Sequence, residues 1–299
     1  MTLNAELRRA QLSPIHQSDD VNDPMRAGEV TVIEPSSGWR ALNVRELWRF
    51  RELLYFLTWR DVKVRYKQTA IGIFWAVLQP LLTMLVFSLL FGRLAKIPSD
   101  NIPYPIFAYS GLLPWTFFAT ALSMAGLSLV ANANMVSKIY FPRLLMPTAA
   151  VLATTIDFAI AFIVLLVLML GYGIAPGIAA LTLPLFLMLA FMTVLGVSLW
   201  LSALNVKYRD VRYVIPFLVQ IWLFMTPVLY PSSMLPSQWR LVYGLNPMAG
   251  VVEGFRWSLL GTEAAPGGMI LVSTSMVLLL FVGGLFYFRR LEREFADVI

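Results

Sequence analysis

Hydrophobic and polar positions divide this chain into a polar N-terminal segment, an amphipathic stretch and a series of long apolar runs. Residues 1–38 carry His16, several acids and scattered Pro, Ser and Gly without an apolar run, which predicts a disordered cytoplasmic tail with no cleaved signal peptide. From Leu42 to about Tyr66, apolar residues such as Leu54 recur on one helical face, with basic residues largely on the other. We therefore expect an amphipathic helix within residues 39–70 that lies in the membrane interface and leads into the first span.

Six apolar runs follow, and a run of about 20 residues is enough for a helix to cross the hydrocarbon core of a bilayer. The pattern predicts an all-α membrane protein whose six-span membrane domain covers residues 71–294, with a short C-terminal segment at 295–299. The predicted spans are Ile71–Phe91, Tyr104–Ala131, Met146–Tyr172, Leu181–Leu204, the slightly short Tyr213–Tyr230, and Met269–Phe288.

The segment between the fifth and sixth spans is apolar but interrupted. Pro236, Gly244 and Pro247 break it, and its longest helical piece, Pro247–Leu260, would reach only about 21 Å, too short to cross. We expect a re-entrant pair of half-helices on the outer side, because backbone broken inside a membrane must be covered by protein or line a cavity.

The distribution of basic residues predicts the orientation. With six spans, only Arg93, Lys96, Arg240 and Arg256, of 23 lysines and arginines, fall on the side opposite the two termini. The positive-inside rule therefore places both termini in the cytoplasm. Counting residues 231–261 as a full span would put the basic C-terminal end of the chain outside, so six spans fit better.

Composition narrows the function classes. The 299 residues are 59% hydrophobic and only 13% charged, with a mean hydropathy of +0.72, which excludes a water-soluble globule. There is no cysteine and one histidine, which removes thiol chemistry and most histidine-based acid–base and zinc chemistry. No G-x-x-x-x-G-K-[ST] string is present, so the chain does not bind ATP through a P-loop.

Asp157 is the one ionisable residue inside a predicted span. A charged Asp near the bilayer centre costs about 2.5–3.5 kcal/mol on insertion scales, so such a residue usually has a role. We favour a structural role, with hydrogen bonds to Thr154, Thr155 or a Ser/Thr of a neighbouring helix. The alternative is the proton site of an ion-coupled secondary transporter, which would ordinarily show further intramembrane charges.

Two short segments could bind something outside the membrane. The basic cluster in residues 60–67 has two interpretations. It sets the membrane topology and attracts anionic lipid, or it binds a phosphate-bearing headgroup. The apolar segment Asn134–Pro147 is a turn in the headgroup layer or a docking surface for a cytosolic partner.

Most intramembrane aromatic residues are expected to pack between helices, and a minority could stack on sugar rings along a conduit. Candidate conduit residues are Trp75, Trp115, Phe118, Trp222 and Phe224.

Four motifs, in order, resemble the permease subunits of ABC transporters that export polysaccharides, most of all O-antigen and lipid-linked glycan exporters. The first is W-R-D-V-K-V-R-Y-K-Q-T-x-x-G followed by W-A-V-L-Q-P. The second is K-I-Y-F-P-R-L-L-M-P, the third N-V-K-Y-R-D-V-R-Y and the fourth L-N-P-M-A-G-V-V-E-G-F-R. They occupy Trp59–Gly72 with Trp75–Pro80, Lys138–Pro147, Asn205–Tyr213, and Leu245–Arg256.

The resemblance implies a homodimer in the bacterial inner membrane, with two copies of a separate nucleotide-binding ATPase subunit that bind ATP and Mg. It implies no cofactor, metal or catalytic residue on this chain, no nucleic-acid partner, and contact with membrane lipids. The implied substrate is undecaprenyl-diphosphate-linked polysaccharide of O-antigen type, with teichoic-acid or capsular polysaccharide as the alternative. A membrane glycosyltransferase is a further alternative, disfavoured because the outer acids Asp100, Glu253 and Glu263 are isolated.

The resemblance also implies roles for matching residues. The residues implied to contact the ATPase are Ser137, Lys138, Ile139, Tyr140, Phe141 and Arg143. The residues implied to bind the diphosphate headgroup are Arg60, Lys63, Arg65 and Lys67. The outer gate is formed by Pro236, Asn246, Pro247, Glu253 and Arg256.

Overall fold

The structure is a computed structural model that describes residues 48–67, 72–261, 267–292 and 295. The chain divides into a unit of residues Met1–Arg40 and a second unit, Ala41–Ile299; all described residues belong to the second. The predicted disordered tail 1–38 lies outside the described residues. So do residues 39–47 and 68–70 of the predicted interfacial helix and residues 296–299 of the predicted C-terminal segment.

The described residues form helices and no strands. Five of these helices are long and apolar enough to cross a membrane, and they correspond to five of the six predicted spans. They are α4 (Gly72–Phe87), which continues as a π-helical segment (Ser88–Leu94), α5 (Tyr104–Ala131), α7 (Leu145–Gly171), α8 (Leu183–Lys207), which follows a 3-10 turn (Ile178–Thr182), and α12 (Gly267–Leu291).

The predicted fifth span is shorter than expected. Its helix, α9 (Val211–Met225), ends at Thr226, so the residues up to Tyr230 are not helical. Fifteen residues reach only about 23 Å at 1.5 Å per residue, less than the hydrocarbon thickness. The predicted span was too long because the apolar run includes non-helical residues, and these are apolar because protein rather than lipid buries them.

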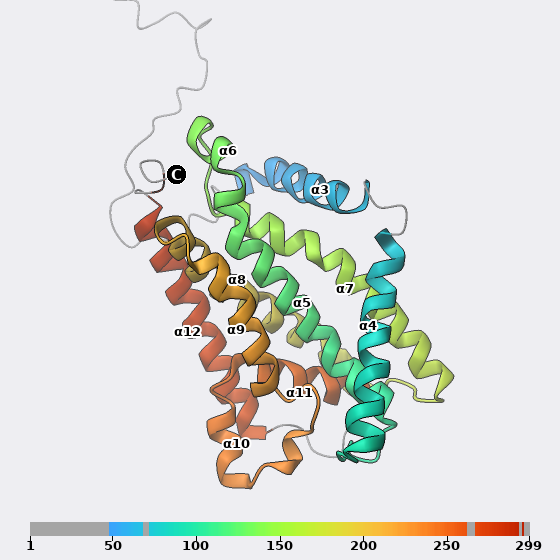
Figure 1. The fold of residues 1–299 in the computed structure, drawn as a ribbon. Coiled ribbons are helices and arrows are strands. Elements are labelled where there is room, and N and C mark those ends of the chain that lie inside the picture. Colours follow the sequence, from blue (N-terminus) through green and yellow to red (C-terminus); the bar gives the residue numbers. More distant parts are fainter. Residues whose placement is uncertain (1–47, 68–71, 262–266, 293–294, 296–299) are drawn as a thin grey trace, which may run out of the picture. The chain divides into compact units, whose positions relative to one another are not determined.

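Shorter helices lie at the two ends of the bundle (Figure 1). Helix α3 (Arg51–Lys67), which the sequence predicts to be interfacial, runs across one end, near α6 (Ala133–Lys138) and the last turn of α12; we call this the α3 end. At the other, the α11 end, lie α10 (Ser237–Tyr243), α11 (Pro247–Leu260) and a 3-10 turn (Ser232–Met234).

The bounds of α11 match the predicted half-helix because both ends carry local signals. The Asn246 side chain accepts a hydrogen bond from the Met248 amide, Pro247 occupies the first turn, and Gly261 ends the helix with a left-handed backbone (φ 60°). Asn at the N-cap, Pro at the first position and Gly after the last turn are the residues that these sites favour.

Helix α3 is less amphipathic than the sequence suggests. Leu57 and Val62 are buried, and α3 packs along α7. Trp48, Tyr55 and Phe56, however, are exposed on the same helix and the residues before it. The outer face of α3 therefore carries large aromatic side chains and is not wholly polar.

The core is built around α5, which packs against α7, α8, α9 and α11. Its side chains Trp115, Phe118 and Leu122 are buried in one cluster with Val194 of α8 and Val251 of α11. The span that includes α4 is the opposite extreme, because none of its window is buried inside the protein. Helix α5 is therefore the central helix, and α4 is peripheral within a single copy of the chain.

Two glycines allow α8 and α12 to cross closely. A Cβ at Gly284 would lie 2.5 Å from the Gly196 carbonyl oxygen, and one at Gly196 would lie 2.8 Å from the Phe281 backbone nitrogen. Small residues at such crossings are what permits backbone approach between membrane helices.

Replacing Gly284 with Leu should force α8 and α12 apart and lower the thermal denaturation midpoint of the detergent-purified chain by several degrees. Gly171→Ala is the matched control, because a Cβ there meets nothing within 4 Å. Equal midpoints for the two variants would contradict the close crossing.

Candidate functional site

Asp157 of α7 is bound by helix α3. The Arg65 guanidinium forms an ion pair with one oxygen of its carboxylate, and the Tyr66 hydroxyl donates a hydrogen bond to the other. The expected partners Thr154 and Thr155 donate instead to the Val151 carbonyl of their own helix. The prediction of threonine or serine partners was therefore wrong, because α3 lies along α7 and brings a cation and a tyrosine hydroxyl to the acid.

The Tyr66 hydroxyl stays protonated at physiological pH. Burial raises the pKa of Tyr66, and the neighbouring Arg65 opposes that rise only in part. A protonated phenol donates to a carboxylate, so Asp157 receives a neutral donor as well as a cation. An acid with both partners is satisfied within the protein, as intramembrane acids generally are.

The four predicted headgroup cations differ in their surroundings. Arg60 pairs with its neighbour Asp61 at 2.8 Å, and Arg65 is bound to Asp157. The Lys63 ammonium lies over the Trp59 ring at 5.6 Å. Lys63 and Lys67 are both exposed, so these two lysines present their charge to the outside of the molecule.

The predicted ATPase-contacting segment is anchored at one residue and exposed at others. Phe141 is only 5% exposed, within a cluster that also contains Leu57, Leu145 and Phe288. Ile139 and Tyr140 just before it are 57% and 69% exposed. Ser137 donates to the Asn134 carbonyl within α6, and Lys138, the last residue of α6, is exposed.

Arg143 ties this segment to the end of α12. Its backbone amide donates to the Glu292 carboxylate at 3.0 Å, and its guanidinium donates to the Glu292 carbonyl and lies over the Phe295 ring at 5.9 Å. Arg289 pairs with the same carboxylate at 2.9 Å. Sequence reasoning missed Glu292, although its i,i+3 spacing from Arg289 signals a helix-surface ion pair.

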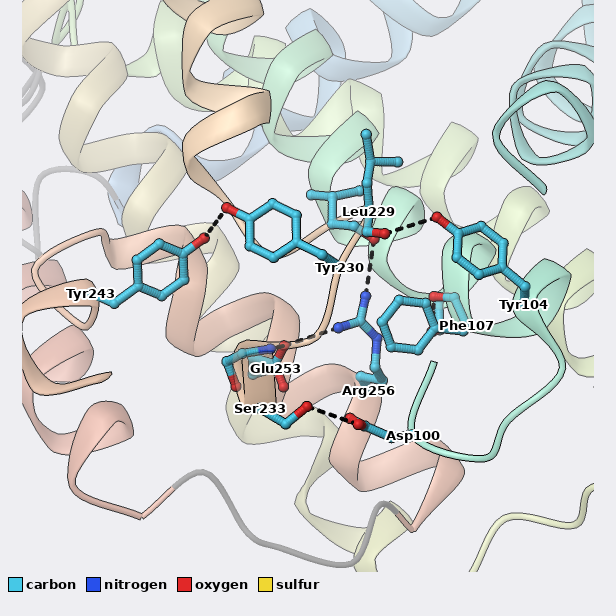
Figure 2. A network of polar contacts seen from close by, with 12 residues as sticks. Asp100, Tyr104, Phe107, Leu229, Tyr230, Ser233, Tyr243, Glu253 and Arg256 are labelled. Atoms are coloured by element: carbon cyan, nitrogen blue, oxygen red, sulfur yellow. Dashed lines mark hydrogen bonds and ion pairs between the residues drawn. The ribbon is translucent and has the colours of Figure 1, made fainter. Parts of the chain in front are cut away.

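At the α11 end, Arg256 is the centre of a buried polar network (Figure 2). Its side chain is 1% exposed. The guanidinium donates to the Glu253 carboxylate at 3.0 Å and the Val228 carbonyl at 3.1 Å, and its carbon lies 3.8 Å from the centre of the Phe107 ring. Arg256 therefore joins α11 to α5 and to the non-helical residues after α9.

Further hydrogen bonds hold the same non-helical residues. The Tyr104 hydroxyl donates to the Leu229 carbonyl at 2.8 Å, and the Tyr230 and Tyr243 hydroxyls are 2.7 Å apart. Ser233 donates to Asp100 at 2.8 Å, beside the network (Figure 2). The bonds of Tyr104 and Ser233 join segments 125 and 133 residues apart, and the Leu229 carbonyl is thereby satisfied by protein.

Burial shifts the pKa values of groups in this network. It raises the pKa of the Glu253 carboxyl, while Arg256 and the Ser232 amide, which donates to that carboxyl at 3.2 Å, act in the opposite direction. Burial and the bond to Tyr230 raise the pKa of Tyr243, so that phenol stays protonated.

Of the other predicted gate residues, Asn246 and Pro247 form hydrogen bonds within the protein, whereas Pro236 is exposed. Asn246 accepts from the Trp222 indole at 2.8 Å and donates to the Met225 carbonyl at 2.9 Å. Pro247 follows it in α11, and its carbonyl accepts from Ser273 of α12 at 2.8 Å. Pro236, before α10, is exposed. The structure thus brings Asn246, Pro247, Glu253 and Arg256 into one packed region.

The candidate conduit aromatics do not form one row. Trp115 and Phe118 are buried against each other, and Phe118 meets Trp222 edge-on with ring centres 5.0 Å apart. Trp75 and Phe224 are exposed. In one copy of the chain, three of the five therefore pack in or against the core.

The described residues contain no group of acids or histidine that could hold a metal ion.

Comparison with known proteins gives consistent matches. A family model described as "ABC-2 type transporter" matches residues 52–260. The chain is 33% identical to the O-antigen export system permease protein RfbA of Myxococcus xanthus, over 86% of this chain and 98% of that protein. It is 30% identical to an RfbA of Klebsiella pneumoniae over 83% and 95% of the two chains. It is 24% identical to the polysialic acid transport protein KpsM of Escherichia coli over 78% and 91%.

Replacing Arg256 with Met should strongly destabilise the protein, because Glu253 would be left buried without its cation, a loss of about 3–5 kcal/mol for a broken buried pair. The double variant Arg256→Met/Glu253→Leu removes both charges and should recover part of that loss. Thermal denaturation in detergent measures both. A double variant less stable than Arg256→Met alone would argue against the pair.

Arg65→Gln and Asp157→Asn should each destabilise the α3 end, and their effects should be non-additive by about 0.5–3 kcal/mol in a double-mutant cycle. Thermal denaturation in detergent gives the four midpoints. Arg60→Gln is the control, because it removes only a half-exposed pair with a sequence neighbour, which is worth about 1 kcal/mol or less. Additive effects of the two substitutions would contradict the coupling.

Proposed function

Because this chain belongs to the ABC-2 type transporter family, a family of transport permeases rather than enzymes, we propose that it is the membrane-spanning subunit of an ATP-driven polysaccharide exporter. The proposed substrate is undecaprenyl-diphosphate-linked polysaccharide of O-antigen type, moved outward across the bacterial inner membrane. The observation that carries this proposal is the similarity to two O-antigen export permeases over nearly their whole lengths.

The α3 end supplies the proposed contact with a separate ATPase. Exposed Ile139 and Tyr140 next to anchored Phe141 form an apolar projection on a rigid base, which suits transmission of movement. Two copies of this chain would pair and bind two ATPase subunits, which hold ATP and Mg. Arg143 and Glu292 would carry movement of this segment to α12.

The proposed topology has six crossings, with α9 and the non-helical residues after it together as the fifth, and both termini in the cytoplasm. The α3 end then faces the cytoplasm, which agrees with its basic residues, and α10 and α11 form the outer re-entrant pair. Arg60, Lys63, Arg65 and Lys67 would meet the diphosphate headgroup. Arg65 would then exchange Asp157 for phosphate, while Lys63 and Lys67 are exposed already.

The outer gate would be the region around Arg256. Because its polar groups are bonded to one another, opening would require α11 to move together with the residues after α9. The proposed conduit would be lined where two copies meet, which suits the exposed Trp75 and Phe224 better than the buried Trp115 and Phe118. Trp222 would move together with Asn246, because its indole donates a hydrogen bond to the Asn246 side chain.

Alternative functions have less support. A capsular polysaccharide exporter rests on a relative with 24% identity, against 33% for an O-antigen permease. Teichoic-acid export rests only on the resemblance of the sequence motifs. An ion-coupled transporter using Asp157 is disfavoured by its bond to Arg65. A glycosyltransferase is disfavoured because Glu253 is engaged by Arg256 and Asp100 by Ser233.

The double variant Ile139→Ala/Tyr140→Ala should lower ATP hydrolysis and glycan export in the reconstituted complex severalfold, while leaving the melting temperature of the chain unchanged, because both side chains are exposed. Ile178→Ala, which changes a still more exposed apolar residue in the 3-10 turn before α8, is the control. Export by the purified chain without any ATPase would overturn the proposed function.

A further inference from the structure

A groove lies between the end of α5 and the connection from α8 to α9. Its volume is about 340 Å³, and Leu127, Val130 and Ala131 of α5 form one apolar wall. Asn205 of α8 lines it as well, and its side-chain amide donates to the Gly126 carbonyl at 3.3 Å. This bond fixes α8 to α5 beside the groove, so its wall is part of the packed bundle.

The other wall is cationic and aromatic. It consists of Arg209, Arg212 and Tyr213, at the start of α9. The Arg212 guanidinium donates to the Arg209 carbonyl at 3.1 Å and lies 5.5 Å from the centre of the Tyr213 ring. These contacts hold Arg212 near the groove and leave further guanidinium N–H groups for a ligand, since each guanidinium carries five.

The arginines of this wall have no carboxylate partner among the described residues, unlike four other arginines. Arg60, Arg65, Arg256 and Arg289 each have a carboxylate partner. Within the described part of the chain, no such ion pair involves Arg209 or Arg212, nor Asp210 between them. The connection also carries Lys207, so it is net positive beside an apolar wall.

An apolar wall that ends in two arginines has the chemistry of an amphiphile site. Guanidinium groups bind phosphate in a bidentate manner, and basic pockets between membrane helices at the headgroup level bind anionic lipid headgroups. The wall belongs to the last turns of a membrane-crossing helix, α5, where acyl chains give way to headgroups. Position and charge therefore select the same class of ligand.

We propose that this groove binds an anionic glycerophospholipid, with its phosphate on Arg209 and Arg212 and an acyl chain along Leu127 and Val130. The proposal does not depend on the transported substrate. The occupied groove would brace the end of α5, which leads through α6 into the apolar segment at Ile139 and Tyr140. A leaflet phospholipid is favoured over a rare lipid-linked glycan because it is present at far higher concentration, and binding follows mass action.

Native mass spectrometry of the full detergent-purified chain, titrated with phosphatidylglycerol or phosphatidylcholine, tests the site. We expect one tightly bound phosphatidylglycerol that phosphatidylcholine does not replace. Arg209→Gln/Arg212→Gln should weaken its binding by about tenfold to thirtyfold, given the usual contribution of two basic residues. Val130→Trp should weaken it too while leaving every charge in place, because the indole would fill the groove.

Lys207→Gln/Arg290→Gln is the matched control, because it removes two exposed cations that do not line the groove. It should leave the tight site intact. Arg209→Gln alone keeps the backbone carbonyl that Arg212 binds, so it tests the site even if the double variant fails to fold. Equal binding of the two phospholipids, unchanged binding by Arg209→Gln, or preferential binding of undecaprenyl phosphate in direct competition would overturn the proposal.

Discussion

The buried Arg256 guanidinium is the group on which the non-helical part of this structure depends. Chain that leaves a helix within a membrane protein exposes carbonyls and amides, and each costs several kcal/mol if it faces lipid. Arg256 donates to the Val228 carbonyl and pairs with Glu253, and Tyr104 donates to the next carbonyl, that of Leu229. A cation thus satisfies broken backbone, a carboxylate neutralises the cation, and the Phe107 ring covers it (Figure 2).

Charge is handled by the same rule at the α3 end. Asp157 belongs to a helix long enough to span a membrane, and its partners Arg65 and Tyr66 come from α3, which runs across the end of the bundle. Arg143 and Arg289 share Glu292 in a similar way. These pairs hold charges inside the protein, whereas Lys63, Lys67 and the two arginines of the groove are among the described cations that form no such pair.

The sequence predicted the long helices well, because apolar length and turn residues are local signals. Tyr104–Ala131 was predicted with the observed bounds, and so was Pro247–Leu260, where Asn246, Pro247 and Gly261 mark the ends. The run Tyr213–Tyr230 was predicted too long. Its last residues are apolar because they are buried by α5 and α11 rather than because they are helical, and hydropathy does not distinguish these two reasons.

Sequence by itself determined the class of protein, the helices, and the places where helices must break. Tertiary structure decided which polar groups meet. Arg65 and Asp157 are 92 residues apart, and Arg143 and Glu292 are 149 apart. Helical periodicity fixes neighbours only at three or four residues' distance, whereas these pairs depend on how α3 crosses α7 and where α12 ends. Packing therefore turned an apparently isolated acid into a bound one.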